Sequence, residues 1–291
     1  GNEQTTVRCD IFIHAILSAR GAMTEAYAGF VRALDVAIRI NSTVDIAELY
    51  GHISVIFSSH GDYVAAIEQN EHALAALKGR NLPFLEALHQ NGIGVSYQRA
   101  GDLTRARRHF ERARDLIGPT GPLAARSSVV MNLADLTMED QRPTEAVPLF
   151  LEALDLARQL GRSHLIGLAL ANLVHALIDS SDVQGARHYL NELDTVNTGE
   201  IPVHIMRHLA HAKVHRVDAD LDNARRRAED ALAVAETNDI PGLAVKCHEI
   251  LRDIAKQTMD FDGFVRHSEA VQQITNTIKG AETARRLELR E

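Results

Sequence analysis

The chain has 291 residues and a formal net charge of −8, which argues against a general nucleic-acid binder or a protein that binds anionic membranes. Hydrophobic residues make up 45% of the chain, enough for a core, and no apolar run reaches the ~18 residues of a membrane span. Two cysteines, Cys9 and Cys247, are too few for a disulfide framework. They suit a reducing cytoplasm, where we expect both to be packed thiols.

A pattern of small and apolar residues returns about every forty residues. The stretch SYQRAGDLTRARRHFERARDL (96–116) contains it: a Gly-Asp turn, then an alanine, then an aromatic residue. Aligning the chain on Gly101 gives seven turn positions, with one interval of 38: Gly21, Gly61, Gly101, Gln141, Ser181, Ala219 and Met259. Five residues after the turn stand Ala26, Ala66, Ala106, Ala146, Ala186, Ala224 and Phe264. Twelve after it stand Ala33, Ala73, Ala113, Ala153, Leu193, Ala231 and Val271, and eight before it stand Ile13, Ile53, Ile93, Leu133, Leu173, His211 and Leu251. These columns predict seven consecutive structural repeats.

In chain order, each repeat predicts two antiparallel helices joined at its turn. Residues suited to cap or start the second helix follow the turns: Asp62, Asp102, Thr144, Asp182 and Asp220. Breaker clusters end the second helix at 40–45, 78–83, 117–122, 160–164, 196–202 and 237–242. The alanine columns let the two helices approach closely, and larger residues fill the space around them: Ile13, Ile93, Leu173, Phe30, Phe110 and Phe150. One such hairpin cannot bury its apolar face alone, so the repeats must stack.

The stretch NGIGVSYQRAGDLTRARRHFERA (91–113) resembles the tetratricopeptide repeat. The signature residues are Ile93, Gly94, Tyr97, Gly101, Ala106, Phe110 and Ala113. The resemblance implies an all-α fold, a right-handed α-solenoid of about seven repeats. It covers almost the whole chain, as an array over 1–264 and a long capping or linker helix over 265–291. The sequence departs from the family in lacking the first-helix tryptophan and in having a period of 40 rather than 34.

No motif for catalysis or cofactor binding stands out. The Gly-x-Gly at 92–94 is not preceded by a predicted strand, and Gly94 stands where the repeat needs a small residue. Walker, His-Glu-x-x-His and Cys-x-x-Cys patterns are missing from the sequence. We therefore expect a protein that is not an enzyme over these residues and that needs no cofactor.

Four histidines follow one side of a single predicted helix. They are His204, His208, His211 and His215, at steps of four, three and four residues. Three interpretations are open: hydrogen-bonded imidazoles at packing positions, a metal site formed by an i, i+4 pair, or a pH-responsive element. The first is favoured, because His211 and His215 stand in columns that are apolar in most other repeats.

The resemblance implies that the first helix of each repeat lines a concave groove. The candidate residues for binding a protein or peptide there are His52, Asn91, Gln98, Arg99, Asn132, Asn172, His175, Lys213 and Arg216. Asparagine and glutamine can pair with the amides of an extended peptide. Asn132 and Asn172 precede the packed Leu133 and Leu173, so a structural role for them is equally open.

The C-terminal segment 265–291 resembles the exit helix that joins tetratricopeptide sensor arrays to bacterial output domains. The expectation is a cytoplasmic, non-catalytic sensory module that regulates a signalling output, with a nucleotide cyclase such as a diguanylate cyclase first among outputs. The alternative is a stand-alone scaffold or a peptide-sensing transcriptional regulator. The chain starts with Gly and ends in a helical pattern, so we expect a fragment of a longer protein. A homodimer through the C-terminal helix is a further expectation.

Overall fold

The described part of the protein is entirely helical. The computed structural model describes the backbone of residues 2–288 and the side chains of residues 3–281. The helices, in chain order, are α1 (Asn2–Ala19), α2 (Met23–Arg39), α3 (Thr43–Ser59), α4 (Tyr63–Leu77), α5 (Pro83–Arg99), α6 (Leu103–Ile117), α7 (Leu123–Glu139), α8 (Pro143–Leu160), α9 (Ser163–Asp179), α10 (Val183–Thr195), α11 (Ile201–Val217), α12 (Leu221–Thr237), α13 (Pro241–Gln257) and α14 (Phe261–Glu288). The predicted all-α class is confirmed for these residues.

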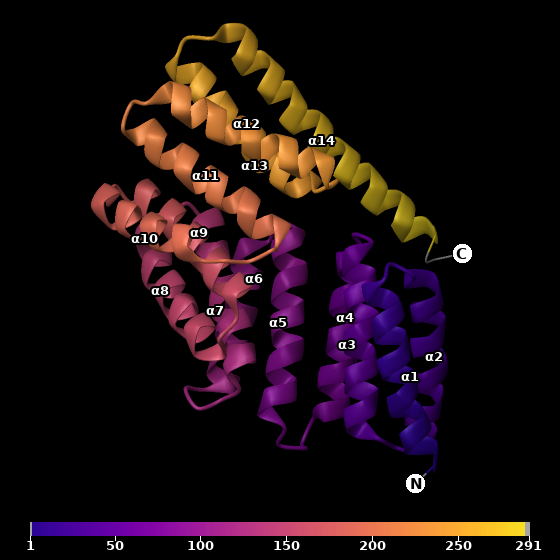
Figure 1. Ribbon diagram of the computed structural model, residues 1–291. Helices are drawn as coiled ribbons and strands as arrows, with labels where there is room; N and C mark the ends of the chain where they lie inside the picture. The colour runs from indigo at the N-terminus through magenta and orange to yellow at the C-terminus, as the bar shows by residue number, and fades with distance from the viewer. Residues whose placement is uncertain (1, 289–291) are drawn as a thin grey trace. The chain divides into compact units, whose positions relative to one another are not determined.

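Consecutive helices pack as helix-turn-helix repeats, and the seven predicted repeats are confirmed. The first helix of a repeat contacts the second, as in α1 with α2, α3 with α4, α5 with α6 and α11 with α12 (Figure 1). The second helix then contacts the first helix of the next repeat, as in α2 with α3 and α4 with α5. Below, an odd-numbered helix is called an A helix and an even-numbered helix a B helix. The handedness of the superhelix stays a prediction.

The turn column of the sequence has one backbone conformation. All seven aligned positions have positive φ: Gly21 (87°), Gly61 (74°), Gly101 (85°), Gln141 (58°), Ser181 (69°), Ala219 (60°) and Met259 (56°). A left-handed residue after the helix end lets following backbone N–H groups bond to the last carbonyls, as Asp102 N–H does to Tyr97 O at 2.9 Å. The B helix then starts at an aspartate N-cap in four repeats: Asp62, Asp102, Asp182 and Asp220. In α8 the N-cap is Arg142, so Thr144 lies inside the helix rather than capping it.

The small columns lie in the core, as predicted. Five residues after the turn, Ala26, Ala66, Ala106, Ala146, Ala186 and Ala224 are all fully buried. The last member, Phe264, is 38% exposed. The prediction for Ile13 is wrong, because its side chain is 50% exposed, whereas Ile53 and Ile93 in the same column are buried. Ile13 lies on α1, which has no preceding helix in the described chain to cover that face.

Ala106→Leu tests the close approach of α5 and α6. Ala106 is fully buried, so three extra heavy atoms must force the helices apart or push Leu into a strained rotamer. We expect the free energy of unfolding to fall by about 1–3 kcal/mol, measured by chemical denaturation. Ala75→Leu, at an exposed position of α4, is the matched control and should change stability little. An unchanged denaturation midpoint for Ala106→Leu would show that this column is not closely packed.

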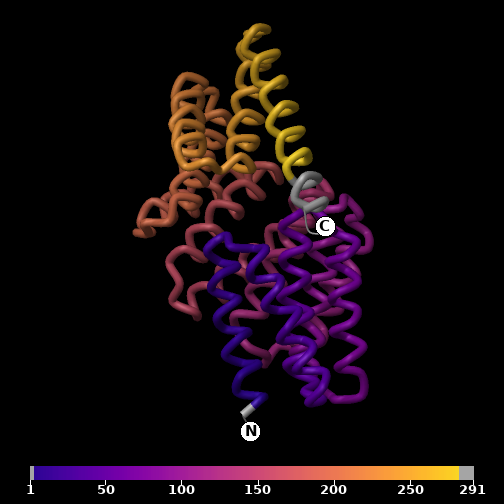
Figure 2. The backbone as a smooth tube through the Cα atoms, turned by 90° about the vertical axis from the view of Figure 1, so that its right-hand side faces the viewer, coloured from indigo at the N-terminus to yellow at the C-terminus, as the bar shows by residue number. Residues whose placement is uncertain are grey.

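Internal contacts divide the chain into two compact units. Unit 1 comprises residues 1–132 and 279–291, and unit 2 comprises residues 133–278. In unit 1, α1 to α4 run up and down beside one another (indigo and purple in Figure 2) around a core that includes Val7, Phe30, Leu49 and Ile56. The candidate sites below are described within one unit at a time.

Helix α14 continues without a break through the position where the array was expected to end. It starts at Phe261, so the B helix of the last repeat and the predicted exit helix are one helix. Met259, Phe261 and Val265 near its start are 70%, 71% and 52% exposed. Dimerisation through residues 265–291 stays a prediction, and residues 289–291 lie outside the described chain. None of the helices in residues 2–288 is long and apolar enough to cross a membrane.

Candidate functional site

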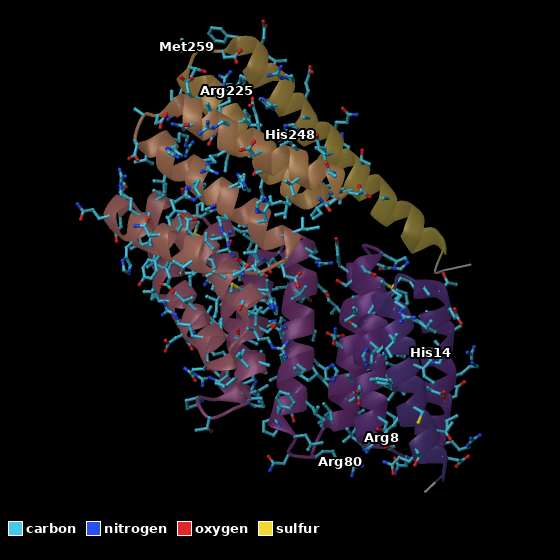
Figure 3. The ribbon with its side chains drawn as sticks, viewed as in Figure 1. Arg8, His14, Arg80, Arg225, His248 and Met259 are labelled. Atoms are coloured by element: carbon cyan, nitrogen blue, oxygen red, sulfur yellow. The ribbon has the colours of Figure 1, made fainter. Side chains whose placement is uncertain are left out.

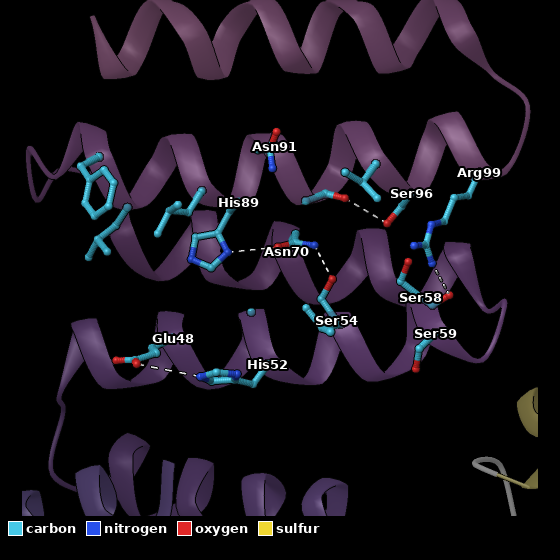
Figure 4. Close-up of a pocket in the computed structure, with 17 residues that line it drawn as sticks. Glu48, His52, Ser54, Ser58, Ser59, Asn70, His89, Asn91, Ser96 and Arg99 are labelled. Atoms are coloured by element: carbon cyan, nitrogen blue, oxygen red, sulfur yellow. Dashed lines mark hydrogen bonds and ion pairs between the residues drawn. The ribbon is translucent and has the colours of Figure 1, made fainter. Parts of the chain in front are cut away.

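Unit 1 contains an open groove between two A helices. It lies between α3 and α5, in front of α4, and has a volume of about 730 Å³ (Figure 4). Volumes of this size are typical of sites for small molecules or short peptide segments. We call it the α3–α5 groove.

The walls of the α3–α5 groove are largely apolar. The apolar side chains that line it are Val55, Phe84, Leu85, Leu88 and Val95. Val55, Phe84 and Leu88 are 60%, 38% and 43% exposed. Apolar side chains gathered in a concave, solvent-open place are typical of binding sites, because covering them releases ordered water.

Three buried polar side chains form a hydrogen-bonded network behind these walls. Asn70, on α4, donates through Nδ2 to Ser54 Oγ on α3 and to the backbone carbonyl of Ala66, the latter at 3.0 Å. His89 Nδ1, on α5, lies 3.0 Å from Asn70 Oδ1. Figure 4 shows His89 extending from α5 toward α3, with Asn70 beside it. We call this the Ser54–Asn70–His89 network.

The repeat columns explain why the network is unusual. Asn70 stands nine residues after its turn, where other repeats have Phe30, Phe110 and Phe150. His89 stands twelve residues before its turn, where other repeats have Leu49 and Val129. Two core positions that are apolar in most other repeats are therefore polar here, and they contact each other. Burying such groups is costly unless they are paired, which they are through Nδ1 and Oδ1.

Two glycines on the A helices make room for the network. A Cβ at Gly92 would lie 3.0 Å from both Asn70 Nδ2 and Oδ1, and a Cβ at Gly51 would lie 3.1 Å from His89 Cε1. Both distances are shorter than ordinary van der Waals contact. The groove therefore depends on the lack of a side chain at these two positions of α5 and α3.

The hydrogen bonds and burial fix the charge and tautomer of His89. The Ala66 carbonyl can only accept, so Asn70 Nδ2 points toward it and Asn70 Oδ1 is left to accept from His89. His89 Nδ1 therefore carries the proton. Burial lowers the pKa of His89 from 6.5 to about 4, so the ring is neutral at pH 7.

Three of the predicted binding residues line the α3–α5 groove. The His52 ring stacks on Phe30, with centroids 4.9 Å apart, and its Nε2 lies 3.9 Å from Glu48 Oε1. Arg99 is exposed at the far end of α5, where its Nη1 lies 3.5 Å from the Ser58 carbonyl oxygen. Asn91 lies between these ends and lines the groove (Figure 4).

The other two candidates in unit 1 lie outside the groove lining. Asn132, on α7, donates through Nδ2 to Asn91 Oδ1 at 2.9 Å. Gln98 is half-buried on α5. The Asn132–Asn91 bond therefore links the A helices of successive repeats and uses one acceptor of Asn91.

Three of the four candidates in unit 2 also belong to contacts between successive A helices. Asn172 Nδ2 donates to Asp135 Oδ1 at 3.2 Å, Lys213 Nζ lies 3.2 Å from Asp179 Oδ2, and Arg216 Nη1 lies 2.8 Å from Asp253 Oδ2. These bonds favour the structural role that the sequence left open for Asn172. They also occupy hydrogen-bond donors of Asn172, Lys213 and Arg216 that a ligand could otherwise use.

His175 is the exception among them. Its Nε2 atom is inaccessible to solvent and has no hydrogen-bond partner among the described residues. Burial, with Lys213 and Lys246 adding repulsion, lowers the pKa of His175 well below 6.5. Burial also raises the pKa of the nearby Asp135 from 3.8 to about 6, although Lys246 opposes this shift. At pH 7 His175 is therefore neutral, whereas Asp135 is still mostly ionised although burial disfavours its charge.

The histidine row on α11 faces aspartates rather than forming one cluster. The pairs are His208 Nδ1 with Asp230 Oδ2 at 3.9 Å, His211 Nε2 with Asp194 Oδ1 at 2.8 Å and His215 Nδ1 with Asp220 Oδ2 at 3.3 Å. His204 contacts the His208 ring, with centroids 4.7 Å apart. In the part of the chain that the structure describes, no three potential ligands gather closely enough to hold a metal ion. The contacts of His211 and His215 fit the packing interpretation, whereas His208 Nδ1 is buried without a hydrogen-bond partner among the described residues.

A second pair of histidines and the two cysteines are not among the residues that line the groove. His248 Nδ1, on α13 (Figure 3), lies 2.9 Å from His267 Nδ1 on α14. Cys247 is buried, and burial raises the pKa of its thiol to about 12, so it is unreactive. The prediction that Cys9 is packed is wrong, because Cys9 is exposed on the open face of α1.

A smaller polar depression lies elsewhere in unit 1. It has a volume of about 670 Å³ and is lined by Glu3, Gln4, Arg8, residues 40–44 and Arg80. Arg8 and Arg80 lie at the same end of unit 1 (Figure 3). Arg8 Nε lies 3.3 Å from the buried Asp45, so its charge is partly neutralised.

The sequence analysis missed Ser54, Asn70 and His89. The signal was available in the same columns that gave the repeats, because Asn70 replaces a phenylalanine and His89 replaces a leucine or valine. Polar residues at two core positions on neighbouring helices, Asn70 on α4 and His89 on α5, therefore predict a polar site inside the array.

Comparison with known proteins identifies solved structures of the same fold. No protein-family model and no curated protein matches the sequence. The apo form of RapI is 11% identical, covers 94% of this chain and 99% of its own, and has a TM-score of 0.78. The apo form of the quorum sensor NprR from B. thuringiensis is 14% identical over 94% of this chain and 77% of its own, with a TM-score of 0.74. A Rap protein complexed with Competence and Sporulation Factor is 11% identical over 94% of this chain and 75% of its own, with a TM-score of 0.70. At these identities the likeness shows the tetratricopeptide-like fold.

Proposed function

We propose that this protein is a non-catalytic module that binds an extended peptide or a partner's peptide segment in the α3–α5 groove. The observation that carries the proposal is the groove itself, in which apolar walls surround the amide of Asn91 and the Ser54–Asn70–His89 network. An extended peptide offers both apolar side chains for such walls and backbone amides for an asparagine.

The structural neighbours support the peptide-sensing alternative over a cyclase-linked sensor. One neighbour is a Rap protein bound to Competence and Sporulation Factor, and another is a quorum sensor. We therefore favour a regulator that responds to a peptide. Nothing among these neighbours favours a nucleotide cyclase as the output.

The Ser59 hydroxyl in the groove is poorly arranged for nucleophilic catalysis. Ser59 Oγ lies 3.2 Å from His60 Nδ1, which resembles a nucleophile–base pair. However, His60 Nδ1 lies 2.8 Å from the Ile56 carbonyl, which can only accept, so Nδ1 carries a proton and cannot remove one from Ser59. This geometry supports a binding role.

Blocking the groove tests the proposed function. The assay is binding to an array of randomised nine-residue peptides, followed by fluorescence polarisation with the best binders. Val55→Arg and Leu88→Arg place a long charged side chain in the groove at exposed positions, so folding should be unaffected. We expect each to weaken binding at least about tenfold, because a cation then faces apolar ligand groups.

Val64→Arg is the matched control for this experiment. Val64 is 68% exposed on α4 and does not line the groove, so binding should be unchanged. Because Asn132 and Asn172 bond to neighbouring helices, their alanine variants would mix loss of binding with loss of packing. Undiminished binding by folded Val55→Arg and Leu88→Arg proteins would place the ligand elsewhere and reject the proposal.

A further inference from the structure

The free nitrogen of His89 is a hydrogen-bond acceptor in a groove whose walls are largely apolar. His89 lines the groove although only 6% of its surface is exposed. Its Nδ1 is occupied by Asn70, and its Nε2 has no hydrogen-bond partner among the described residues. A ligand that fills the groove removes water from this nitrogen and must therefore supply a donor, or the acceptor stays buried and unpaired.

The Ser54–Asn70–His89 network fixes His89 Nε2 as a hydrogen-bond acceptor. Asn70 Nδ2 is held by Ser54 and by the Ala66 carbonyl, so Asn70 Oδ1 can only accept and His89 Nδ1 must donate. The lone pair of Nε2 is thereby fixed in place. A neutral imidazole in this tautomer accepts one hydrogen bond from an N–H or O–H group.

The surroundings of His89 select the kind of group that carries the donor. Val55, Phe84 and Leu88 favour a large, flat apolar body. Asn70 also stands in a column where three other repeats have a buried aromatic ring, at Phe30, Phe110 and Phe150. From His89 itself a lysine or arginine would gain only a neutral acceptor in exchange for the water that its charge loses.

We propose that the α3–α5 groove selects a tryptophan or tyrosine side chain of its peptide ligand, whose indole N–H or phenol O–H donates to His89 Nε2. The inference rests on the proposed function, because it names the side chain that the peptide places in that groove. Indole and phenol share the required chemistry, an aromatic ring with one donor at its edge.

The absence of tryptophan from the chain gives a direct binding assay. The probes are N-acetylated, C-amidated five-residue alanine peptides with a central Trp, 1-methyl-Trp, Tyr or Phe. Indole fluorescence of the first two reports on the ligand alone, and calorimetry measures all four. We expect the Trp or Tyr peptide to bind about tenfold more tightly than the 1-methyl-Trp and Phe peptides, which keep a ring but lack the donor.

A protein variant assigns this preference to His89. His89→Leu removes the acceptor and introduces the residue found in the same column at Leu49. The variant should lose the difference between the Trp and 1-methyl-Trp peptides, whereas Val64→Arg should keep it. If His89→Leu does not fold, as judged by circular dichroism, the comparison of the four peptides on the unmodified protein still decides the question.

The outcomes separate this inference from the proposed function. Equal binding of the Trp, 1-methyl-Trp and Phe peptides, abolished by Val55→Arg, would overturn the inference and leave the proposed function standing. The same holds if the array yields groove-bound peptides that contain neither Trp nor Tyr. If no peptide binds, or if Val55→Arg and Leu88→Arg leave binding unchanged, the proposed function falls and the inference falls with it.

Discussion

Phe110→Ala is expected to lower the free energy of unfolding by about 3–5 kcal/mol. Phe110 is fully buried, and its ring lies against the backbone of α5 at Gly94, where an added Cβ would lie 2.6 Å from ring atoms Cδ1 and Cε1. Removing the ring leaves a cavity between α5 and α6 that rigid helices cannot close. Urea denaturation followed by circular dichroism measures the loss.

A double-mutant cycle shows whether the ring and Gly94 act together. Gly94→Ala alone should be destabilising, because the new Cβ meets the ring. In the Phe110→Ala background the same change should cost little, since the ring is gone. Phe12→Ala is the matched control, because Phe12 is 68% exposed and its loss leaves no cavity. Additive effects of Gly94→Ala and Phe110→Ala would contradict the contact.

The same pair of helices connects stability to the proposed function. Helix α5 packs through Gly94 on Phe110 of α6, and its residues His89 and Asn91 line the groove. A loss of α5–α6 packing should therefore weaken peptide binding as well. The groove variants Val55→Arg and Leu88→Arg should weaken peptide binding without lowering the free energy of unfolding, since they leave the core intact.

The fold was predictable because each repeat imposes the same local requirements. The turn column needs a left-handed residue, and even Gln141, Ser181, Ala219 and Met259 adopt that conformation where glycine is missing. The alanine column needs a small residue, because its members are fully buried where two helices meet. Such requirements recur every forty residues, so a single sequence contains enough copies of the pattern to reveal them.

The candidate site was predictable only in part, because its contacts join residues of different repeats. His52, Asn91 and Arg99 line the groove, and their role in binding stays a prediction. The bond between Asn132 and Asn91 and that between Asn172 and Asp135 could not be read from periodicity, which gives a residue's face but not its partner. Periodicity also did not predict the exposure of Cys9 and Ile13 on α1.

One column of the A helices changes character along the chain. Six residues before the turn, unit 1 has the apolar Val55 and Val95, both of which line the α3–α5 groove. In unit 2 the same column has Asp135, His175 and Lys213. In a repeat architecture the core columns stay constant while this column can vary. It is therefore apolar in unit 1 and ionisable in unit 2. Asp135 is the clearest case, because burial disfavours its charged form.

Asp135→Asn is expected to stabilise the protein at neutral pH. Burial raises the pKa of Asp135 from 3.8 to about 6, so between these values the folded protein holds a proton that the unfolded chain has lost. Stability contributed by the protonated carboxyl is therefore fully present below pH 3.8 and is lost as the pH rises to about 6. Above that pH the folded protein contains a half-buried carboxylate, at a cost on the order of 1–3 kcal/mol.

Asparagine removes this cost and keeps the contact. Its side-chain oxygen can still accept from Asn172 Nδ2, which lies 3.2 Å from Asp135 Oδ1. Thermal unfolding at pH 7.5 should show a higher melting temperature for Asp135→Asn, and the difference should vanish near pH 4. Asp155→Asn, at an exposed position of α8, removes the same charge and should change little at either pH. A lower melting temperature of Asp135→Asn at pH 7.5 would mean that attraction to Lys246 outweighs burial, and that Asp135 is held in the fold as a charged group.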